Sequence, residues 1–133
     1  MIVLDTHVWL WWISNPEKLS IAANQAIDQA ITESSIIISS ISVWEVALLV
    51  EKGRLKLSID VRDWVRKTES LPFVRFVPVD NTISLRSTSL PGQFHPDPAD
   101  RIITATALTM GLPLVTKEEK MINYPHVQTL WEN

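Results

Sequence analysis

After Met1 the chain runs Ile2-Val3-Leu4-Asp5-Thr6-His7, and this stretch decides the fold that the sequence predicts. Three apolar residues indicate a short core strand, and the strand ends directly on an acid. The next segment, 6–13, is apolar almost all round and carries three tryptophans; a helix of that kind is either buried or part of an interface. Asp5 therefore lies between a buried strand and an apolar helix, which is not the setting of an ordinary surface acid.

Strand-like and helical segments alternate along the rest of the chain. Ile36-Ile37-Ile38 is β-branched without polar alternation, as expected for a strand covered on both faces. Further strands are predicted at 73–79, where Pro78 marks an edge strand or its end, at 113–116 and at 127–130. Helices are predicted at about 20–33, 43–52, 60–68, 80–90 and 99–110, with a proline-rich loop at 91–98. This alternation is typical of an α/β domain with a mostly parallel sheet.

Composition limits the function without assigning it. The 133 residues correspond to a single domain, expected to span 1–133, and 46% of them are hydrophobic against 20% charged. No apolar run approaches the ~20 residues of a membrane span, and the N-terminus lacks the pattern of a secretory signal, so we expect a cytoplasmic protein. Without cysteine, a metal would need oxygen or imidazole ligands. The net charge of −3 argues against binding nucleic acid through a broad basic surface.

Acids recur at equivalent places in the predicted fold. Asp5 follows the first strand, Glu45 opens the helix after the second, and Glu118 comes just after the strand at 113–116. Asp97 and Asp100 flank the start of the helix after the proline-rich loop. In an open parallel sheet, ligands bind in the crevice outside the carboxyl ends of the strands, and each of these segments can deliver an acid to that edge.

The chemistry of such a cluster favours a divalent cation. Carboxylates that are forced together take up protons unless a cation compensates them. Mg²⁺ and Mn²⁺ prefer oxygen ligands and can activate water and orient a phosphodiester. Helix N-termini beneath Glu45 and Asp100 are expected to favour the ionised carboxylates by ~0.3–1 kcal/mol each.

Three of these acids, unlike Asp5, also have a simpler interpretation. Ser42-x-x-Glu45 matches a capping box, in which Glu45 would only bond a backbone N–H. Asp100 could serve only as a dipole partner of its helix, and Glu118 lies in Lys117-Glu118-Glu119-Lys120, a sequence typical of a solvated turn. No single acid is a strong signal, so the prediction rests on their joint placement.

The same segments resemble a known family. The motifs are Ile2-Val3-Leu4-Asp5-Thr6-His7, Ser42-Val43-Trp44-Glu45, His95-Pro96-Asp97-Pro98-Ala99-Asp100-Arg101 and Leu112-Pro113-Leu114-Val115-Thr116. Together, and in this order, they look like PIN-domain proteins of the VapC type, the toxin ribonucleases of bacterial toxin–antitoxin pairs. The resemblance spans Ile2 to about Trp131 and implies a three-layer α/β/α domain around a central, mostly parallel sheet of four to five strands.

The resemblance also implies an activity and a site. Asp5, Glu45 and Asp100 match the metal-binding acids of the family, and Thr6 and Thr116 match polar residues beside them. The implied activity is Mg²⁺- or Mn²⁺-dependent hydrolysis of RNA by an activated water, leaving a 5′-phosphate. The implied partners are the RNA substrate, a cognate antitoxin that covers the acidic pocket, and a second copy in a homodimer. The tryptophan-rich helix and the apolar helix after the second strand suit such interfaces, or plain core packing.

Several residues near these motifs keep more than one interpretation. Glu118 stands where the family usually has Asp, so its geometry as a ligand is in question. Asp97 is a ligand, an indirect support or a loop-shaping residue. Arg101 contacts substrate phosphate or pairs with an acid. The spacing of the histidines does not match a zinc site. His7 is expected to form a hydrogen bond at the start of its helix, and His95 is expected to order its loop.

Two other functions compete with the ribonuclease interpretation. A phosphatase-like enzyme with a strand-end nucleophile needs a second Asp at short spacing from Asp5, which the sequence lacks. A catalytically weak or inactive PIN-fold binding module remains, since both the Glu at position 118 and the acidic balance of charges are compatible with it.

Overall fold

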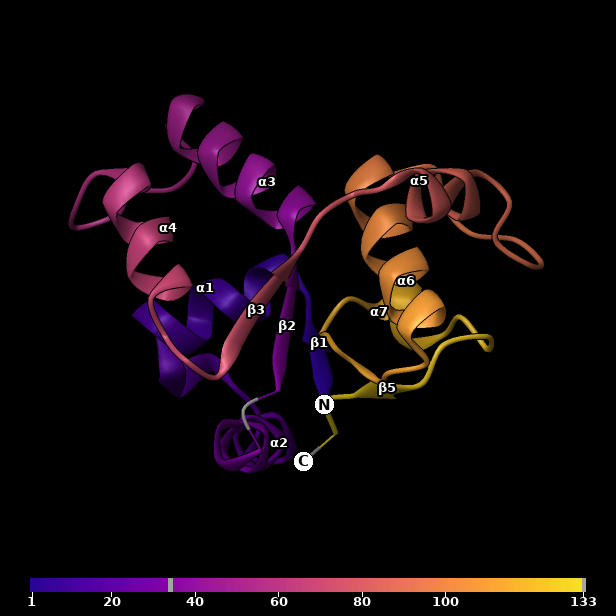
Figure 1. Ribbon diagram of the computed structural model, residues 1–133, viewed down its shortest axis with the longest axis horizontal. Helices are drawn as coiled ribbons and strands as arrows, with labels where there is room; N and C mark the ends of the chain where they lie inside the picture. Colours follow the sequence, from indigo (N-terminus) through magenta and orange to yellow (C-terminus); the bar gives the residue numbers. More distant parts are fainter. Residues whose placement is uncertain (34, 133) are drawn as a thin grey trace.

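A computed structural model describes residues 1–33 and 35–132. These residues form a five-stranded sheet in the order β3-β2-β1-β4-β5, and every strand pairing is parallel (Figure 1). The strands are β1 (Ile2–Leu4), β2 (Ile36–Ser39), β3 (Val74–Val77), β4 (Leu114–Val115) and β5 (Thr129–Leu130). The α/β class is confirmed, and β3 is an edge strand, as Pro78 predicts.

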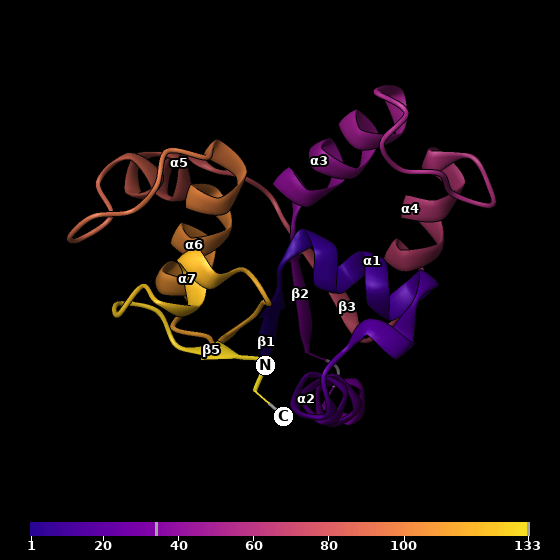
Figure 2. The same ribbon diagram turned by 180° about the vertical axis from the view of Figure 1, so that it is seen from behind.

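Helices cover both faces of the sheet, because successive strand residues point to opposite sides. Ile2 and Leu4 face a core shared with α1 (Thr6–Ser14), α2 (Ile21–Thr32) and α4 (Val61–Glu69). Val3 and Ile37 face a second core with α5 (Asn81–Thr88), α6 (Pro98–Met110) and α7 (Glu119–Ile122). Figures 1 and 2 show these two helical groups on either side of the strands, the three-layer arrangement that the resemblance implies.

Most element boundaries differ from the predictions by one to three residues. The largest change is in α3, which spans Ser40–Glu51 and begins three residues before the predicted Val43. Its N-cap is Ser39, whose hydroxyl accepts from the N–H of Ile41. Gly111 ends α6 with a φ of 65°, the left-handed conformation that glycine adopts readily. Helix α7 and the short 3₁₀ helix η1 (Pro16–Lys18) have no counterpart among the predicted elements.

The three tryptophans of α1 have different surroundings. Trp9 is fully buried, its ring packs 4.6 Å from that of Trp64, and its Nε1 donates to Thr68. Trp12 packs against Phe73 and is only partly buried. Core packing therefore explains Trp9. No helix among residues 1–33 and 35–132 has the length and apolar character needed to cross a membrane.

Candidate active site

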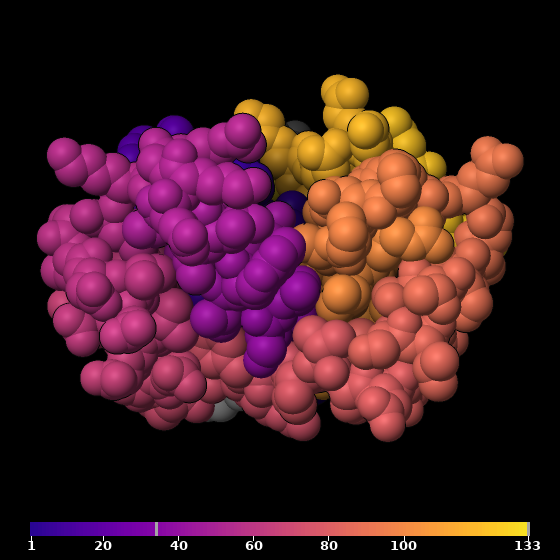
Figure 3. All heavy atoms as spheres, turned by 90° about the horizontal axis from the view of Figure 1, so that it is seen from above, coloured from indigo at the N-terminus to yellow at the C-terminus, as the bar shows by residue number. Residues whose placement is uncertain are grey.

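A pocket opens at the carboxyl edge of the sheet, beside the point where the chain order reverses. From β1 the chain proceeds to β2 and β3 on one side, while β4 pairs with the other side of β1. Figure 3 shows a hollow between α3 (purple) and α6 (orange), with the yellow C-terminal part of the chain along the upper edge of this view. The lining residues are Asp5, His7, Trp11, Glu45, Asp97, Asp100, Lys117, Glu118 and Glu119. All the predicted acids therefore meet here, at the crevice where parallel sheets bind ligands.

Asp5 lies at the bottom of this pocket and is 5% exposed. It is the N-cap of α1: Oδ1 accepts from the N–H of Thr6 at 2.7 Å, while Oδ2 accepts from the hydroxyl of Thr116 at 2.8 Å. Burial raises the pKa of Asp5, and these two hydrogen bonds oppose the rise only in part. A charge at this position is therefore costly unless a cation compensates it.

Glu45 is positioned by Thr6, the residue that follows Asp5. The hydroxyl of Thr6 donates to Oε1 of Glu45 at 2.5 Å and lies 2.8 Å from the hydroxyl of Ser42. Because Thr6 has a single hydroxyl proton, Ser42 is the donor in the second bond. The capping-box interpretation of Ser42 and Glu45 is wrong, since Ser39 caps the helix and Glu45 is its sixth residue. The prediction that a helix N-terminus favours the ionised Glu45 carboxylate is wrong for the same reason. Burial raises the pKa of Glu45.

Thr116 connects Glu118 to Asp5. Its hydroxyl oxygen accepts from the N–H of Glu118 at 3.0 Å and donates to Asp5. Glu118 is the N-cap of α7, and its Oε1 accepts from the N–H of Lys120 at 3.3 Å. The solvated-turn interpretation is therefore partly right: Glu118 caps a short helix, yet its side chain also lines the pocket.

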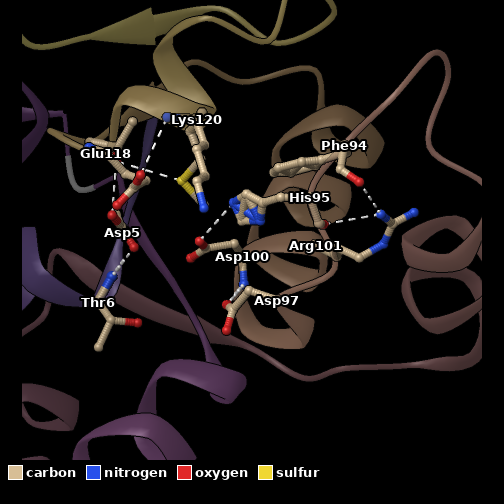
Figure 4. A network of polar contacts seen from close by, with 11 residues as sticks. Asp5, Thr6, Phe94, His95, Asp97, Asp100, Arg101, Glu118 and Lys120 are labelled. Atoms are coloured by element: carbon tan, nitrogen blue, oxygen red, sulfur yellow. Dashed lines mark hydrogen bonds and ion pairs between the residues drawn. The ribbon is translucent and has the colours of Figure 1, made fainter.

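Asp97 and Asp100 come from the N-terminus of α6. Asp97 caps the helix by accepting from the N–H of Asp100 at 2.9 Å. Nε2 of His95 lies 3.1 Å from Oδ2 of Asp100, close enough for an ion pair but without hydrogen-bond alignment (Figure 4). Burial, followed by the charges of the neighbouring acids, raises the pKa of Asp100 to about 8. The helix dipole expected to favour the ionised carboxylate is therefore outweighed.

The donor set fits a hard divalent cation. The acids offer only oxygen ligands, and the raised pKa values of Asp5, Glu45 and Asp100 indicate negative charge in need of compensation. Within the described parts of the chain, however, no three acidic or histidine side chains are grouped tightly enough to hold an ion in the conformations seen. Asp5, Glu45, Asp100 and Glu118 would hold such a cation, but in these conformations their carboxylates do not converge on one point.

Arg101 points away from the acids, as Figure 4 shows. Its Nε donates to the carbonyl of Ser87, and one terminal nitrogen donates to the carbonyls of Phe94 and His95. The guanidinium thus ties the loop before α6 to the end of α5. Arg101 is not among the residues that line the pocket, so this geometry gives no support to a contact with substrate phosphate or with an acid.

We expect Arg101→Ala to act mainly on stability. The substitution leaves three carbonyls without their charged donor, and we expect the free energy of unfolding to fall by about 1–3 kcal/mol. Urea denaturation of this variant beside Arg62→Ala, which removes an exposed arginine of α4, measures the difference. Equal stability of the two variants would contradict the structural role.

Four pocket residues were not predicted as part of the site: His7, Trp11, Lys117 and Glu119. Trp11 lies one helical turn after His7 on α1, and both line the pocket. Lys117 is the one lysine or arginine among the lining residues, and its Nζ lies 5.9 Å above the ring of Trp11. The charged sequence at 117–120 does not predict this contact, which depends on β4 lying beside β1.

The family model described as "PIN domain" matches residues 2–127. The chain belongs to the PIN-domain family. This PIN domain is also 37% identical over 132 residues to "Ribonuclease VapC22" of Mycobacterium tuberculosis, a match that covers 98% of each chain. The resemblance to VapC-type proteins is therefore confirmed.

Solved structures share the fold of this PIN domain at lower identity. A chain in the crystal structure of VapBC2 from Rickettsia felis bound to a DNA fragment aligns with a TM-score of 0.73 and 18% identity, covering 99% of this chain and 100% of that one. A chain of a toxin–antitoxin complex from Klebsiella pneumoniae aligns with a TM-score of 0.65 and 23% identity, covering 96% and 95%. At these identities the likeness establishes the fold alone.

Proposed function

We propose that the protein is a VapC-type ribonuclease, the toxin of a toxin–antitoxin pair, which hydrolyses RNA phosphodiesters at the carboxylate pocket. The observation that carries the proposal is the convergence of five acids, Asp5, Glu45, Asp97, Asp100 and Glu118, on one pocket. The proposal is supported by the 37% identity to a protein named as a ribonuclease, which extends over nearly the whole chain.

In this proposal Asp5, Glu45 and Asp100 hold Mg²⁺ or Mn²⁺, and Glu118 completes the set. When bound, the cation supplies an acidified water and a positive counter-charge for the phosphate. Thr6 and Thr116 are positioning residues, because each donates its hydroxyl proton to one of the acids. Asp97 supports the site through the cap that fixes the start of α6.

Besides its proposed role as a metal ligand, Glu118 has a structural role. Its carboxylate caps α7 through the N–H of Lys120, at the long distance of 3.3 Å. A bond of that length is easily given up, and the extra methylene of Glu lets the carboxylate turn toward Asp5. We therefore assign Glu118 to the ligand set, in the place where the family usually has Asp.

A catalytically inactive binding module is the alternative function. It is favoured by one observation, that no three acids of the described chain are already gathered around one point. In the ribonuclease proposal the partners are RNA, a cognate antitoxin and a second copy of the chain in a homodimer, and the site of action is the cytoplasm. The partly exposed α3, with Trp44 52% exposed, suits one of these protein contacts.

The purified, antitoxin-free protein is expected to cleave RNA in Mg²⁺ or Mn²⁺ and to stop when EDTA is added. The products should carry 5′-phosphates, which a phosphate-dependent 5′ exonuclease detects. Gel analysis of labelled structured RNAs measures the cleavage. If well-folded protein cleaves none of them with either cation, the binding module is the better account.

A further inference from the structure

A second groove adjoins the acidic pocket and has the opposite charge. It lies between α1, the C-terminal end of α3, the segment 54–59 and α4, which are neighbours in Figure 2. Four cationic side chains line it, and none of the acids in the described chain does. In a protein of net charge −3, this separation of charge is notable. The cations are Lys18, Arg54, Lys56 and Lys67.

The sequence explains why the cations gather here. In 54–59, apolar and polar residues alternate: Leu55, Leu57 and Ile59 pack against the core, while Arg54 and Lys56 stay exposed. An extended chain places alternate residues on opposite sides, so the apolar ones anchor the segment and the cations remain in water.

Helix α1 provides the opposite wall. Its residues His7, Leu10, Trp11 and Ser14 follow the spacing of one helix face, and all four line the groove. His7 and Trp11 also line the acidic pocket, so the two depressions share one wall. The acidic pocket and the groove therefore lie next to each other, with Trp11 at the boundary.

Charge and aromatic character together indicate the occupant. Surfaces that bind single-stranded nucleic acid combine cations for the phosphates with an aromatic ring on which a base stacks. We infer that this basic groove binds the single-stranded RNA that flanks the scissile phosphate, with Lys56 and Lys67 among the phosphate contacts and Trp11 at the junction. The inference rests on the proposed function, since it assigns the path of the substrate away from the acids.

The double variant Lys56→Gln/Lys67→Gln tests this inference. Its control is Lys52→Gln/Arg62→Gln, which removes the same charge from exposed residues that do not line the groove. Both pairs are placed in an Asp5→Asn background so that the RNA stays intact. Fluorescence anisotropy with a labelled single-stranded RNA of about 12 nucleotides gives the affinity. Thermal unfolding verifies that both variants are folded.

We expect the groove variant to bind RNA at least about fivefold more weakly than the control. The dependence of log affinity on log salt should also become shallower by about 1.4, since each phosphate contact to a single strand contributes about 0.7. Equal affinity and equal slope in the two variants would overturn the inference. So would a loss confined to an acidic peptide used in place of RNA, because the groove would then be a protein-binding site.

Cleavage by the protein with native Asp5 separates this inference from the proposed function. If that protein cleaves RNA and the groove substitutions change neither affinity nor KM, only the groove assignment fails. If it cleaves nothing, the ribonuclease proposal fails, while the anisotropy measurement still decides whether the groove binds RNA.

Discussion

Asp5→Asn is expected to reduce cation-dependent RNA cleavage on the order of 100-fold or more, without loss of the fold. Changing residues that only support metal ligands already costs roughly 10–100-fold, and Asp5 is proposed as a ligand itself. The substitution keeps the shape of the side chain and removes its negative charge, so the loss falls on the affinity for the cation and on the reaction it supports.

The hydrogen bonds around Asp5 explain why the fold should survive. An asparagine retains the oxygen that accepts from the N–H of Thr6 and so keeps the cap of α1. Its amide can donate to the hydroxyl of Thr116, which has a second lone pair beside the one facing Glu118. The hydroxyl proton of Thr116 can then turn to the sulfur of Met121, 3.6 Å away.

Initial cleavage rates over a range of Mn²⁺ concentrations measure this effect. The control is Asp28→Asn, the same change at an exposed position of α2 that does not line the pocket. A folded Asp5→Asn protein with the activity of the Asp28 variant would remove Asp5 from the catalytic set and, with it, the central support for the proposed site.

The convergence of the acids could be predicted from the sequence because it follows from topology. Parallel strands end at the same edge, so an acid placed just after a strand is brought to that edge whatever the detailed packing. Asp5 and Glu118 needed only this rule, and β1 and β4 do pair side by side. The order of the motifs then indicated the family.

Local detail was predicted less well where two signals competed. Ser39, Ser40 and Ser42 are all acceptable helix caps, and only the end of β2 decides that Ser39 is used. Arg101 was ambiguous for another reason: its partners are backbone carbonyls of Ser87, Phe94 and His95, which no side-chain pattern reveals. The basic groove joins segments distant in sequence, so the charges of 54–67 did not predict it.

In EDTA, the stability of the protein is expected to fall as the pH rises from about 5 to about 8. The carboxyl of Asp100 has an ordinary pKa of 3.8 and a folded pKa of about 8. Between these values the folded protein keeps a proton that the unfolded chain has released. The stability that this proton contributes is complete below the lower pKa and is lost as the pH passes the higher one.

The expected size of the fall is about 2 kcal/mol, or on the order of 8 °C in Tm. This is less than the full linkage value, because the side chain of Asp100 is 20% exposed and water screens its charge. Asp5 and Glu45 act in the same direction, since burial raises their pKa values too.

Thermal unfolding at several pH values measures the loss of stability in EDTA and the stabilisation by Mn²⁺. A cation at 100 times its Kd adds about 2.7 kcal/mol, so Mn²⁺ should cancel the fall at pH 8. Asp100→Asn should flatten the profile in EDTA, whereas Asp28→Asn should leave it unchanged, which assigns the pH dependence to the acidic pocket. A stability that is constant or rises toward pH 8 in EDTA would mean that the acids do not repel one another as their shared pocket implies, and that no cation is needed to hold them together.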